Sequence, residues 1–215
     1  MRKEISKNAK TIEPPKFFLI AGNLSVDFVN TKIVENGAPK DLLADFRDLA
    51  AWAAATNLLQ KAEAEKLAAD WSGREEIKEA FAEALDFRKI LHSMVADLAR
   101  GKTVSAAAIK AINREIKNQS GAIEVQKTEN GFEKLFRAAF KEPRQLLAPI
   151  AESAADLLCY GNPLYLKKCE SDECVLYFYD TTKNHSRLWC SMAGCGNRAK
   201  AAAFYRRAKS KLGNR

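Results

Sequence analysis

Four of the five cysteines are grouped in two pairs that share one spacing, Cys169-x4-Cys174 and Cys190-x4-Cys195. Fifteen residues separate the two pairs, a length that suits a hairpin. Such a pattern is typical of a tetrahedral four-cysteine zinc site, in which each pair presents two sulfurs to one ion. Two disulfides are the competing interpretation, but disulfides are rare in a reducing cytoplasm. We therefore predict one structural Zn2+ bound by all four cysteines.

A zinc ion with four protein ligands has no open position for a catalytic water, which argues against zinc-dependent hydrolysis. The chain also shows no nucleophile–base set, no glycine-rich phosphate loop and no further metal-binding triad. The fifth cysteine, Cys159, is expected on a helix as a small buried residue. We therefore predict that the protein is not an enzyme.

Basic residues are concentrated at the C-terminal end. The net charge of the chain is +8, and after Thr181 there are nine Lys or Arg residues and no Asp or Glu. Such polarity favours an anionic partner, most commonly nucleic acid, although a solubilising tail has the same composition. A helix is expected from the last cysteine to about Leu212, and a zinc-anchored basic helix suits the major groove or phosphate groups. The candidate nucleic-acid contacts are Arg187, Arg198, Lys200, Arg206 and Arg207.

Two features of this predicted helix concern packing. For Arg198, a structural role such as stacking on Trp189 is as well supported as a contact with phosphate. Apolar residues at helical spacing form a stripe, and we expect this stripe to lie on the zinc hairpin. Its members are Ala201, Phe204, Tyr205, Ala208 and Leu212.

Polar residues interrupt an apolar segment near the N-terminus, LSVDFVNT. Asp27 and Asn30 either cap or cross-link the local backbone or, together with Thr31, line a ligand pocket. The first interpretation is the simpler one. The second makes the N-terminal part of the chain a candidate sensor of a small-molecule effector.

The rest of the sequence indicates how these residues are positioned. We expect a mainly helical α+β protein with three parts. An N-terminal arm covers residues 1–15, and a helical domain with a small β-hairpin, which serves regulation, ligand binding or dimerisation, covers residues 16–162. A four-cysteine finger of β-hairpin plus helix covers residues 163–215. PKFFLIAG suits a strand, whereas LSVDFVNT fits either a strand or a helix. A helix that started at Pro143 would be kinked at Pro149. Apolar periodicity predicts helices over 41–56, 61–71 and 74–100. Two further helices are expected, one capped by Ser105 and one that reaches Cys159 from Pro143 or Pro149. Turn residues predict a hairpin that pairs 122–126 with 132–136.

The segment CESDECVLYFYDTTKNHSRLWCSMAGCGNRAKAAAFYRR resembles the CGNR zinc-finger family, whose naming tetrad is Cys195-Gly196-Asn197-Arg198 here. The resemblance includes both cysteine pairs, the region of Asp180 and Ser186-Arg187, and the run from Trp189 to Met192. Upstream, GNLSVDFVNT and DLAAW resemble the start of the helical domain usually joined to this finger. The family is regarded as bacterial stress-related transcription regulators, so the resemblance implies DNA binding. One departure is the run Ala201 to Tyr205, where such fingers often continue with dense Arg and His.

These observations favour a zinc-dependent transcription regulator that binds double-stranded DNA through its finger. Its N-terminal domain would bind an unknown effector or form a homodimer. One alternative is an RNA-binding protein in which Tyr177 or Tyr179 stacks on unpaired bases, unless both belong to the hairpin core. Another alternative is a finger that binds only protein. A weak dependence of binding affinity on salt would distinguish it from a finger that binds nucleic acid. No apolar run approaches the ~20 residues of a membrane span and no signal peptide is visible, so we expect a cytoplasmic protein without a membrane partner.

Overall fold

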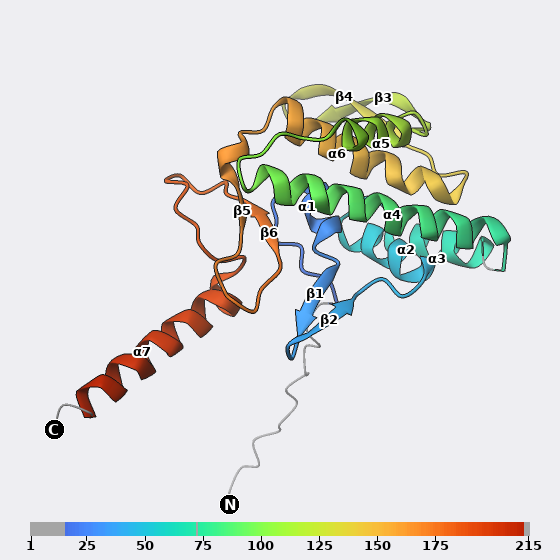
Figure 1. The fold of residues 1–215 in the computed structure, drawn as a ribbon. Coiled ribbons are helices and arrows are strands. Elements are labelled where there is room, and N and C mark those ends of the chain that lie inside the picture. Colours follow the sequence, from blue (N-terminus) through green and yellow to red (C-terminus); the bar gives the residue numbers. More distant parts are fainter. Residues whose placement is uncertain (1–15, 72, 213–215) are drawn as a thin grey trace, which may run out of the picture.

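The computed structural model describes residues 16–71 and 73–212, so the predicted arm over residues 1–15 lies outside the described residues. The chain forms a helical domain, followed by a cysteine-rich module that ends in a long helix (Figure 1). We call residues 163–212 the finger. This is the mainly helical α+β fold that the sequence predicts. In chain order the elements are α1 (Leu24–Val29), β1 (Lys32–Glu35), β2 (Ala38–Asp41), α2 (Phe46–Ala55), α3 (Lys61–Asp70), α4 (Glu75–Leu98), α5 (Ala106–Ile116), β3 (Gly121–Thr128), β4 (Gly131–Ala138), η1 (Pro143–Leu146), α6 (Leu147–Cys159), η2 (Pro163–Tyr165), β5 (Leu166–Lys168), β6 (Tyr177–Tyr179), η3 (Met192–Gly196) and α7 (Asn197–Leu212).

The core of the helical domain forms around α4, which packs against α1, α2 and α5. The apolar residues of α4 recur every three or four positions, so one side of the helix faces its neighbours. Phe87 and Leu91 on that side are fully buried. Phe28 of α1 and Trp52 of α2 are buried as well, and their ring centroids lie 5.1 Å apart. Burial of each such side chain contributes roughly 1.5–3 kcal/mol, so this domain is stabilised mainly by its apolar core.

The helix boundaries follow the sequence closely in the middle of the chain. Ser105 caps α5 by accepting a hydrogen bond from Ala108 N at 3.2 Å, as predicted. The last helix of the domain starts as a 3-10 turn at Pro143 and becomes α-helical at Leu147. Pro149 lies in the first turn of α6, where a backbone N–H has no intrahelical partner, so it does not break the helix.

The N-terminal segment differs from the prediction of a strand. Residues 16–23 are irregular, because their backbone groups bond to side chains and to β6 instead of to a neighbouring strand. Asp27 accepts hydrogen bonds from the N–H groups of Ile20 and Ala21, both at 2.9 Å. Tyr179 N donates to Ala21 O at 2.7 Å. The following segment, which fitted either a strand or a helix, forms α1.

A hairpin that the sequence analysis did not predict follows α1. β1 and β2 pair in antiparallel register, with Lys32 opposite Asp41. The turn between them is Asn36-Gly37, whose φ angles of 52° and 78° are the positive values that a type I′ turn requires. Because residues 38–41 belong to β2, the helix predicted over 41–56 begins later, at Phe46.

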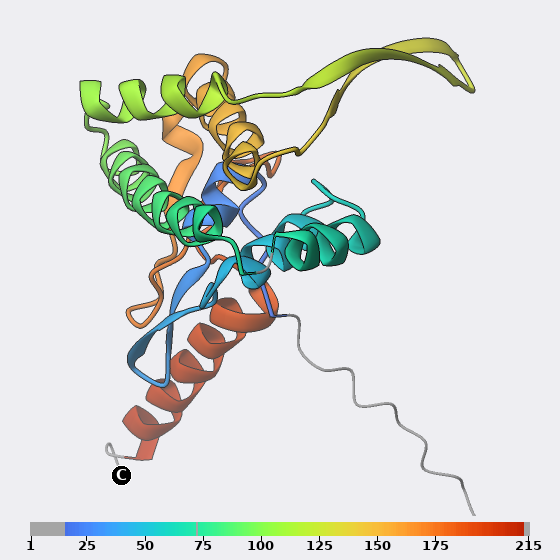
Figure 2. The ribbon, with the colours of Figure 1, turned by 90° about the vertical axis from the view of Figure 1, so that its right-hand side faces the viewer.

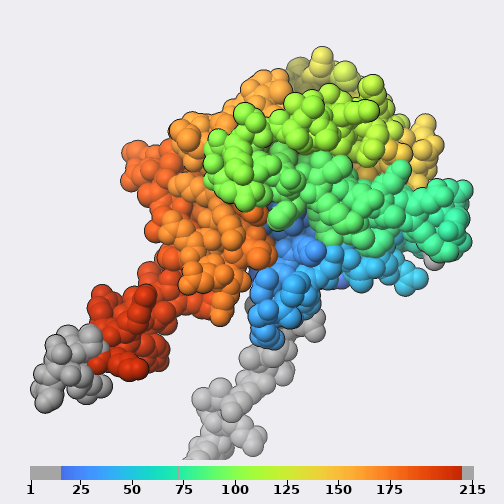
Figure 3. Space-filling view, viewed as in Figure 1, coloured from blue at the N-terminus to red at the C-terminus, as the bar shows by residue number. Residues whose placement is uncertain are grey.

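Two elements extend away from the body of the molecule. The predicted hairpin is confirmed as β3–β4, which projects from the helical domain with most of its side chains exposed (Figure 2). α7 projects from the finger in another direction and forms a separate arm in the space-filling view (Figure 3). None of the described helices is both long enough and apolar enough to cross a membrane.

Candidate metal centre and nucleic-acid interface

The four predicted zinc ligands lie together in the finger. The Sγ atoms of Cys169, Cys174, Cys190 and Cys195 all lie within 4.8 Å of one another, and all four residues are buried. The Sγ of Cys190 is 3.7 Å from that of Cys174 and 3.5 Å from that of Cys195. Zn–S bonds of about 2.3 Å in a tetrahedron give sulfur–sulfur edges of about 3.8 Å. The cluster therefore fits one zinc ion, and the predicted four-cysteine site is confirmed.

A short antiparallel hairpin positions the first cysteine pair. β5 pairs with β6, and just beyond the strands Cys169 N donates to Leu176 O at 2.9 Å. Cys174 N donates to Ser171 O at 2.9 Å, which closes the turn between the two cysteines. The backbone of the hairpin therefore brings the sulfurs of Cys169 and Cys174 to the same end of the β5–β6 hairpin.

A π-helical turn positions the second pair and leads directly into α7. This turn, Met192–Gly196, contains the last cysteine. A Cβ atom on Gly196 would lie 2.7 Å from the Sδ of Met192 and 3.2 Å from Cδ1 of Trp189, so a larger residue would displace the turn. Close packing thus explains the glycine of the tetrad. Because α7 begins at the next residue, Asn197, the metal site fixes the position of its first turn.

The sulfur cluster favours a bound cation. The hydrogen bond with Cys190 lowers the pKa of Cys174 to about 5. The same contact raises the pKa of Cys190, and burial raises the pKa of Cys195. One thiolate therefore forms readily, but it makes a second thiolate in contact with it unfavourable. A divalent cation between the sulfurs removes this conflict, because it compensates the charge of several thiolates at once.

Two nitrogen donors lie against the sulfurs. Cys190 N is 3.3 Å from Cys169 Sγ, and Nη2 of Arg198 is 3.0 Å from Cys195 Sγ. N–H groups directed at metal ligands stabilise them and fix their orientation. The structure therefore gives Arg198 a structural contact, with a ligand sulfur in place of the Trp189 ring suggested by the sequence.

A buried carboxylate organises the loop between β6 and the second cysteine pair. Asp180 is fully buried and accepts hydrogen bonds from Lys167 Nζ at 2.8 Å, Thr182 N at 3.0 Å and Arg187 N at 2.9 Å. Burial raises the pKa of Asp180, but these hydrogen bonds outweigh it and hold the pKa well below its usual range. Asp180 was part of the family resemblance, but its role could not be predicted, since Lys167 comes from another strand.

Arg187 joins the finger to the helical domain. Its guanidinium lies over the Phe178 ring, with Cζ 4.1 Å from the centroid. It donates to the carbonyl groups of Trp189 at 2.9 Å and Ile20 at 3.0 Å, and also to that of Cys190. These partners all lie within the protein, so the structure gives Arg187 a structural role, and its contact with nucleic acid stays a prediction.

Asn30 and Thr31 are bonded within the protein and do not form the predicted ligand pocket. The Asn30 side chain donates to Tyr177 O at 2.8 Å and accepts from Tyr177 N at 3.0 Å, so it pairs with β6 as a neighbouring strand would. Thr31 Oγ1 donates to Phe28 O and accepts from Arg88, both at 2.7 Å. Both side chains are at least nine-tenths buried, which leaves them unavailable to a ligand.

Asp27, the third predicted pocket residue, is also used internally. Its Oδ1 accepts the two hydrogen bonds from Ile20 and Ala21 described above. Burial raises its pKa to about 6, in spite of these hydrogen bonds and the nearby charge of Arg187. The structure therefore supports the interpretation that Asp27 and Asn30 cross-link the backbone.

α7 does not lie on the zinc hairpin as predicted. It packs mainly against η3, and Phe204 and Tyr205 of the predicted stripe are 63% and 71% exposed. The prediction is wrong because the helix leads straight out from the turn at its first residue (Figure 1). Lys200, Arg206 and Arg207 are exposed on this helix. Their contact with nucleic acid stays a prediction.

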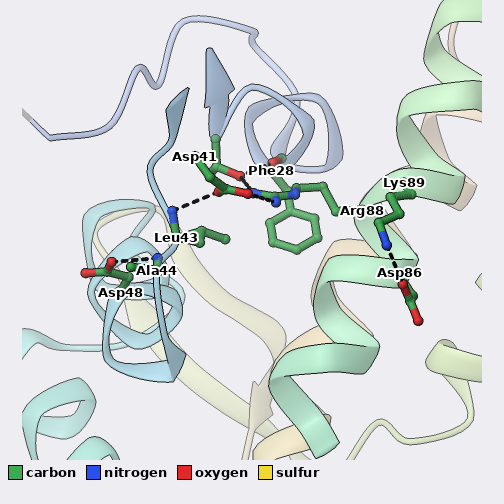
Figure 4. A network of polar contacts seen from close by, with 9 residues as sticks. Phe28, Asp41, Leu43, Ala44, Asp48, Asp86, Arg88 and Lys89 are labelled. Atoms are coloured by element: carbon green, nitrogen blue, oxygen red, sulfur yellow. Dashed lines mark hydrogen bonds and ion pairs between the residues drawn. The ribbon is translucent and has the colours of Figure 1, made fainter. Parts of the chain in front are cut away.

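A polar network that was not predicted lies between β2 and α4 (Figure 4). Arg88 is 6% exposed and donates to both carboxylate oxygens of Asp41 and to Thr31 Oγ1. Burial raises the pKa of Asp41, but the hydrogen bond from Arg88 outweighs it and lowers the pKa. Asp41 also accepts from Leu43 N at 3.0 Å. In the sequence, this network was indicated only by an arginine next to the apolar side of the helix predicted over 74–100.

Burial also bears on three other expectations. Tyr177 is buried, and Tyr179 Oη accepts a hydrogen bond from Asn162 N at 2.9 Å, so both tyrosines belong to the packed hairpin. Cys159 is exposed at the end of α6. This corrects the expectation of a buried residue, because the last turn of α6 leaves the core.

Comparison with known proteins agrees with this organisation. A search of curated proteins found no match. Residues 22–161 match the ABATE family model, described as "Putative stress-induced transcription regulator", and residues 165–208 match the CGNR zinc finger. The first match covers most of the helical domain, and the second contains all four cysteines and most of α7. The chain therefore belongs to the ABATE family and carries a CGNR zinc finger after the family domain.

Proposed function

We propose that this protein is a zinc-dependent transcription regulator whose finger binds double-stranded DNA through α7. One observation carries the proposal: a basic helix begins beside the last zinc ligand and projects from the body of the molecule with Lys200, Arg206 and Arg207 exposed (Figures 1 and 3). Zinc would hold the first turn of this helix in place, and the helix would enter the major groove as a rigid rod.

The dimensions and side chains of α7 support this proposal. A helix of 16 residues is about 24 Å long, and the major groove of B-DNA, about 12 Å wide, admits one helix. Lys200, Phe204 and Arg207 are spaced by four and three residues, so they share one face. Two cations for phosphate groups therefore flank an apolar ring that suits a thymine methyl group. Arg206 lies on another face of the helix.

The alternative functions have less support. RNA binding was predicted to use Tyr177 and Tyr179, but both are part of the packed hairpin. An interaction with protein alone gives no reason for a C-terminal end rich in Lys and Arg and without acidic residues. We also propose that the protein is not an enzyme, since four cysteines fill the zinc coordination sphere.

We propose further that the helical domain regulates the finger, through an effector or through dimerisation. One observation favours dimerisation: four large apolar residues of β3–β4 are exposed and, by the strand register, share one face. Such a surface is typical of an interaction site. Sedimentation equilibrium should show a dimer that dissociates in a Val125→Ser/Phe132→Ser variant, and a monomeric wild type would contradict this role. The four residues are Ile123, Val125, Phe132 and Phe136.

Fluorescence anisotropy with a labelled random-sequence duplex tests DNA binding by α7. The Lys200→Gln/Arg207→Gln variant removes two charges from one face of the helix. The Lys102→Gln/Lys110→Gln variant removes the same charge from exposed positions of the helical domain. We expect the α7 variant alone to bind more weakly, with a slope of log K against log salt reduced by about 2. Equal losses in both variants would contradict a specific interface on α7. Tighter binding of wild type to single-stranded RNA than to the duplex would favour the RNA alternative.

A further inference from the structure

A cavity of about 410 Å³ lies where the β1–β2 hairpin, α4 and the finger meet. Its walls include Ile33 and Val34 of β1, Leu85 of α4 and Val175 of the finger. The volume falls at the lower end of the ~300–1,000 Å³ that is typical of small-molecule sites. The walls are mostly apolar, so the cavity suits the hydrocarbon part of a small ligand.

The polar side chains that line this cavity are mainly cationic. Lys32, Arg88, Lys89 and His92 line it, against the single carboxylate of Asp41. Arg88 is committed to Asp41 and Thr31, and Lys89 forms an ion pair with Asp86 (Figure 4). Arg88, Lys89 and Asp41 therefore already have partners within the protein and do not need a ligand to balance their charges.

Lys32 and His92 are the two polar groups that remain. The Nζ of Lys32 forms no hydrogen bond or salt bridge with any residue in the described ranges 16–71 and 73–212, although its charge helps to lower the pKa of Asp41 on the neighbouring strand. The His92 ring contacts Tyr177 edge to face at 5.7 Å, and its nitrogens have no hydrogen-bond partner among the same residues. Burial, followed by the charges of Lys32 and Arg100, lowers the pKa of His92, so the imidazole that lines the cavity is neutral at neutral pH and can donate one hydrogen bond. A cation and a neutral donor therefore converge at the edge of an apolar cavity.

We propose that this cavity binds a small apolar monocarboxylate. Its carboxylate accepts hydrogen bonds from Lys32 and His92, and its hydrocarbon part packs against Ile33, Leu85 and Val175. A cationic ligand is excluded by the charge of Lys32. A phosphate ester would have to bury a dianion among apolar walls, which is costly without more donors. An uncharged ligand of the same shape loses the charge-assisted hydrogen bond to Lys32.

The position of the cavity gives this ligand a regulatory meaning, which rests on the proposed function. Val175 follows the zinc ligand Cys174, and Val29, which also lines the cavity, precedes Asn30, whose amide holds β6. The ligand therefore contacts both sides of the junction between the helical domain and the finger. Because it binds only when these two sides are in place, it stabilises the docked arrangement of the finger.

Titration of the zinc-loaded full-length protein with benzoate and hexanoate tests the site, with benzamide as the uncharged analogue of benzoate. Methyl NMR shifts of Ile33, Leu85 and Val175 report the location of binding, and hydrogen exchange of the Tyr177 amide reports the junction. The Lys32→Gln variant removes the cation from the cavity. The Lys40→Gln variant, on the same hairpin but outside the cavity lining, is the matched control.

We expect the carboxylates to shift these methyl signals and to slow exchange of the Tyr177 amide. Benzamide and the Lys32→Gln variant should each weaken binding about tenfold or more, as the loss of one charge-assisted hydrogen bond predicts, whereas Lys40→Gln should match wild type. The proposal is overturned if neither carboxylate shifts these signals at up to about 10 mM, or if Lys32→Gln binds as wild type does. DNA binding is measured separately on the same samples. Carboxylate binding that depends on Lys32 in a protein without DNA affinity would support this site while contradicting the proposed function.

Discussion

The core of the helical domain consists of large apolar side chains such as Phe28, Trp52 and Phe87, whereas in the finger a few apolar side chains such as Phe178 are buried beside four cysteines and the carboxylate of Asp180. The difference follows from size. A segment of about fifty residues buries too little apolar surface to fold on that basis alone. The finger compensates with a metal site, with the Asp180 network and with contacts to the helical domain through Arg187 and Asn30. α7 lies beyond all of these contacts, so its orientation depends on them.

The largest expected effect is the loss of zinc. Structural zinc contributes on the order of 10 kcal/mol in isolated zinc fingers, and the apolar core of this finger is small. A chelator should therefore make the amides of Cys169 and Tyr179 exchange rapidly, while the amides of Phe87 and Leu91 in α4 stay protected. Hydrogen exchange followed by mass spectrometry checks this contrast. Loss of protection in α4 together with the finger would show that the two parts unfold as one unit.

The second effect concerns the buried carboxylate of the finger. Asp180→Asn keeps the shape of the side chain but removes the charge that pairs with Lys167, and we expect it to lower the free energy of unfolding by roughly 3 kcal/mol. The folded pKa of Asp180 is lowered, so its contribution is present above the unfolded pKa of about 3.9 and is lost only as pH falls through the lower folded value. Urea unfolding should therefore give the same difference from wild type at pH 8 and pH 6. The exposed Asp172→Asn serves as control, and a variant indistinguishable from it would contradict the role of Asp180.

The third effect concerns Asp27, in the segment that joins the helical domain to the finger. Its substitution is expected to raise the free energy of unfolding, not to lower it. Burial raises the pKa of Asp27 to about 6, so the folded protein holds a proton that the unfolded chain releases near pH 3.9. Its contribution to stability is therefore fully present below pH 4 and is lost as pH rises through about 6. Asp27→Asn should match wild type near pH 4.5 and be more stable by about 1–2 kcal/mol at pH 7.5. If the variant were less stable at both pH values, attraction between the Asp27 carboxylate and Arg187 would outweigh burial.

The smallest effect is expected at Arg198, which contacts a ligand sulfur. Arg198→Lys keeps the charge but cannot reproduce the guanidinium donor geometry, so zinc should transfer about tenfold faster to a chromophoric chelator. Arg206→Lys, a matched change on the same helix, should leave the transfer rate unchanged. Equal rates in the two variants would contradict a stabilising role of Arg198 at the metal site.

Local patterns made much of this structure predictable. The cysteine spacing indicated the zinc site, and the apolar repeat of α4 indicated the longest helix. The β1–β2 hairpin was missed although Asn36-Gly37 is a strong turn signal, because the short strands have little alternation of their own. The orientation of α7 was predicted wrongly because an apolar stripe has the same spacing whether it is packed or exposed.

The contacts between the finger and the helical domain could not be predicted in the same way. Arg187 bonds to Ile20 across 167 residues, and Asn30 bonds to Tyr177 across 147. A polar residue in an apolar segment indicates that some partner exists, but it does not identify that partner. The same limit explains why a pocket at Asn30 and Thr31 stayed an alternative in the sequence analysis, while the cavity lined by Lys32 and His92 was found only in the structure.

We propose that zinc builds a nucleic-acid interface on a finger whose helical partner domain folds without it. The most direct measurement is binding to a random DNA duplex at two salt concentrations, comparing the zinc-loaded protein with a Cys174→Ala/Cys190→Ala variant. We predict that wild type binds at low salt and weakens steeply as salt rises, and that the variant keeps a folded helical domain but does not bind. A wild type that carries one equivalent of zinc and binds no duplex, or a variant that binds as well as wild type without zinc, would contradict the claim.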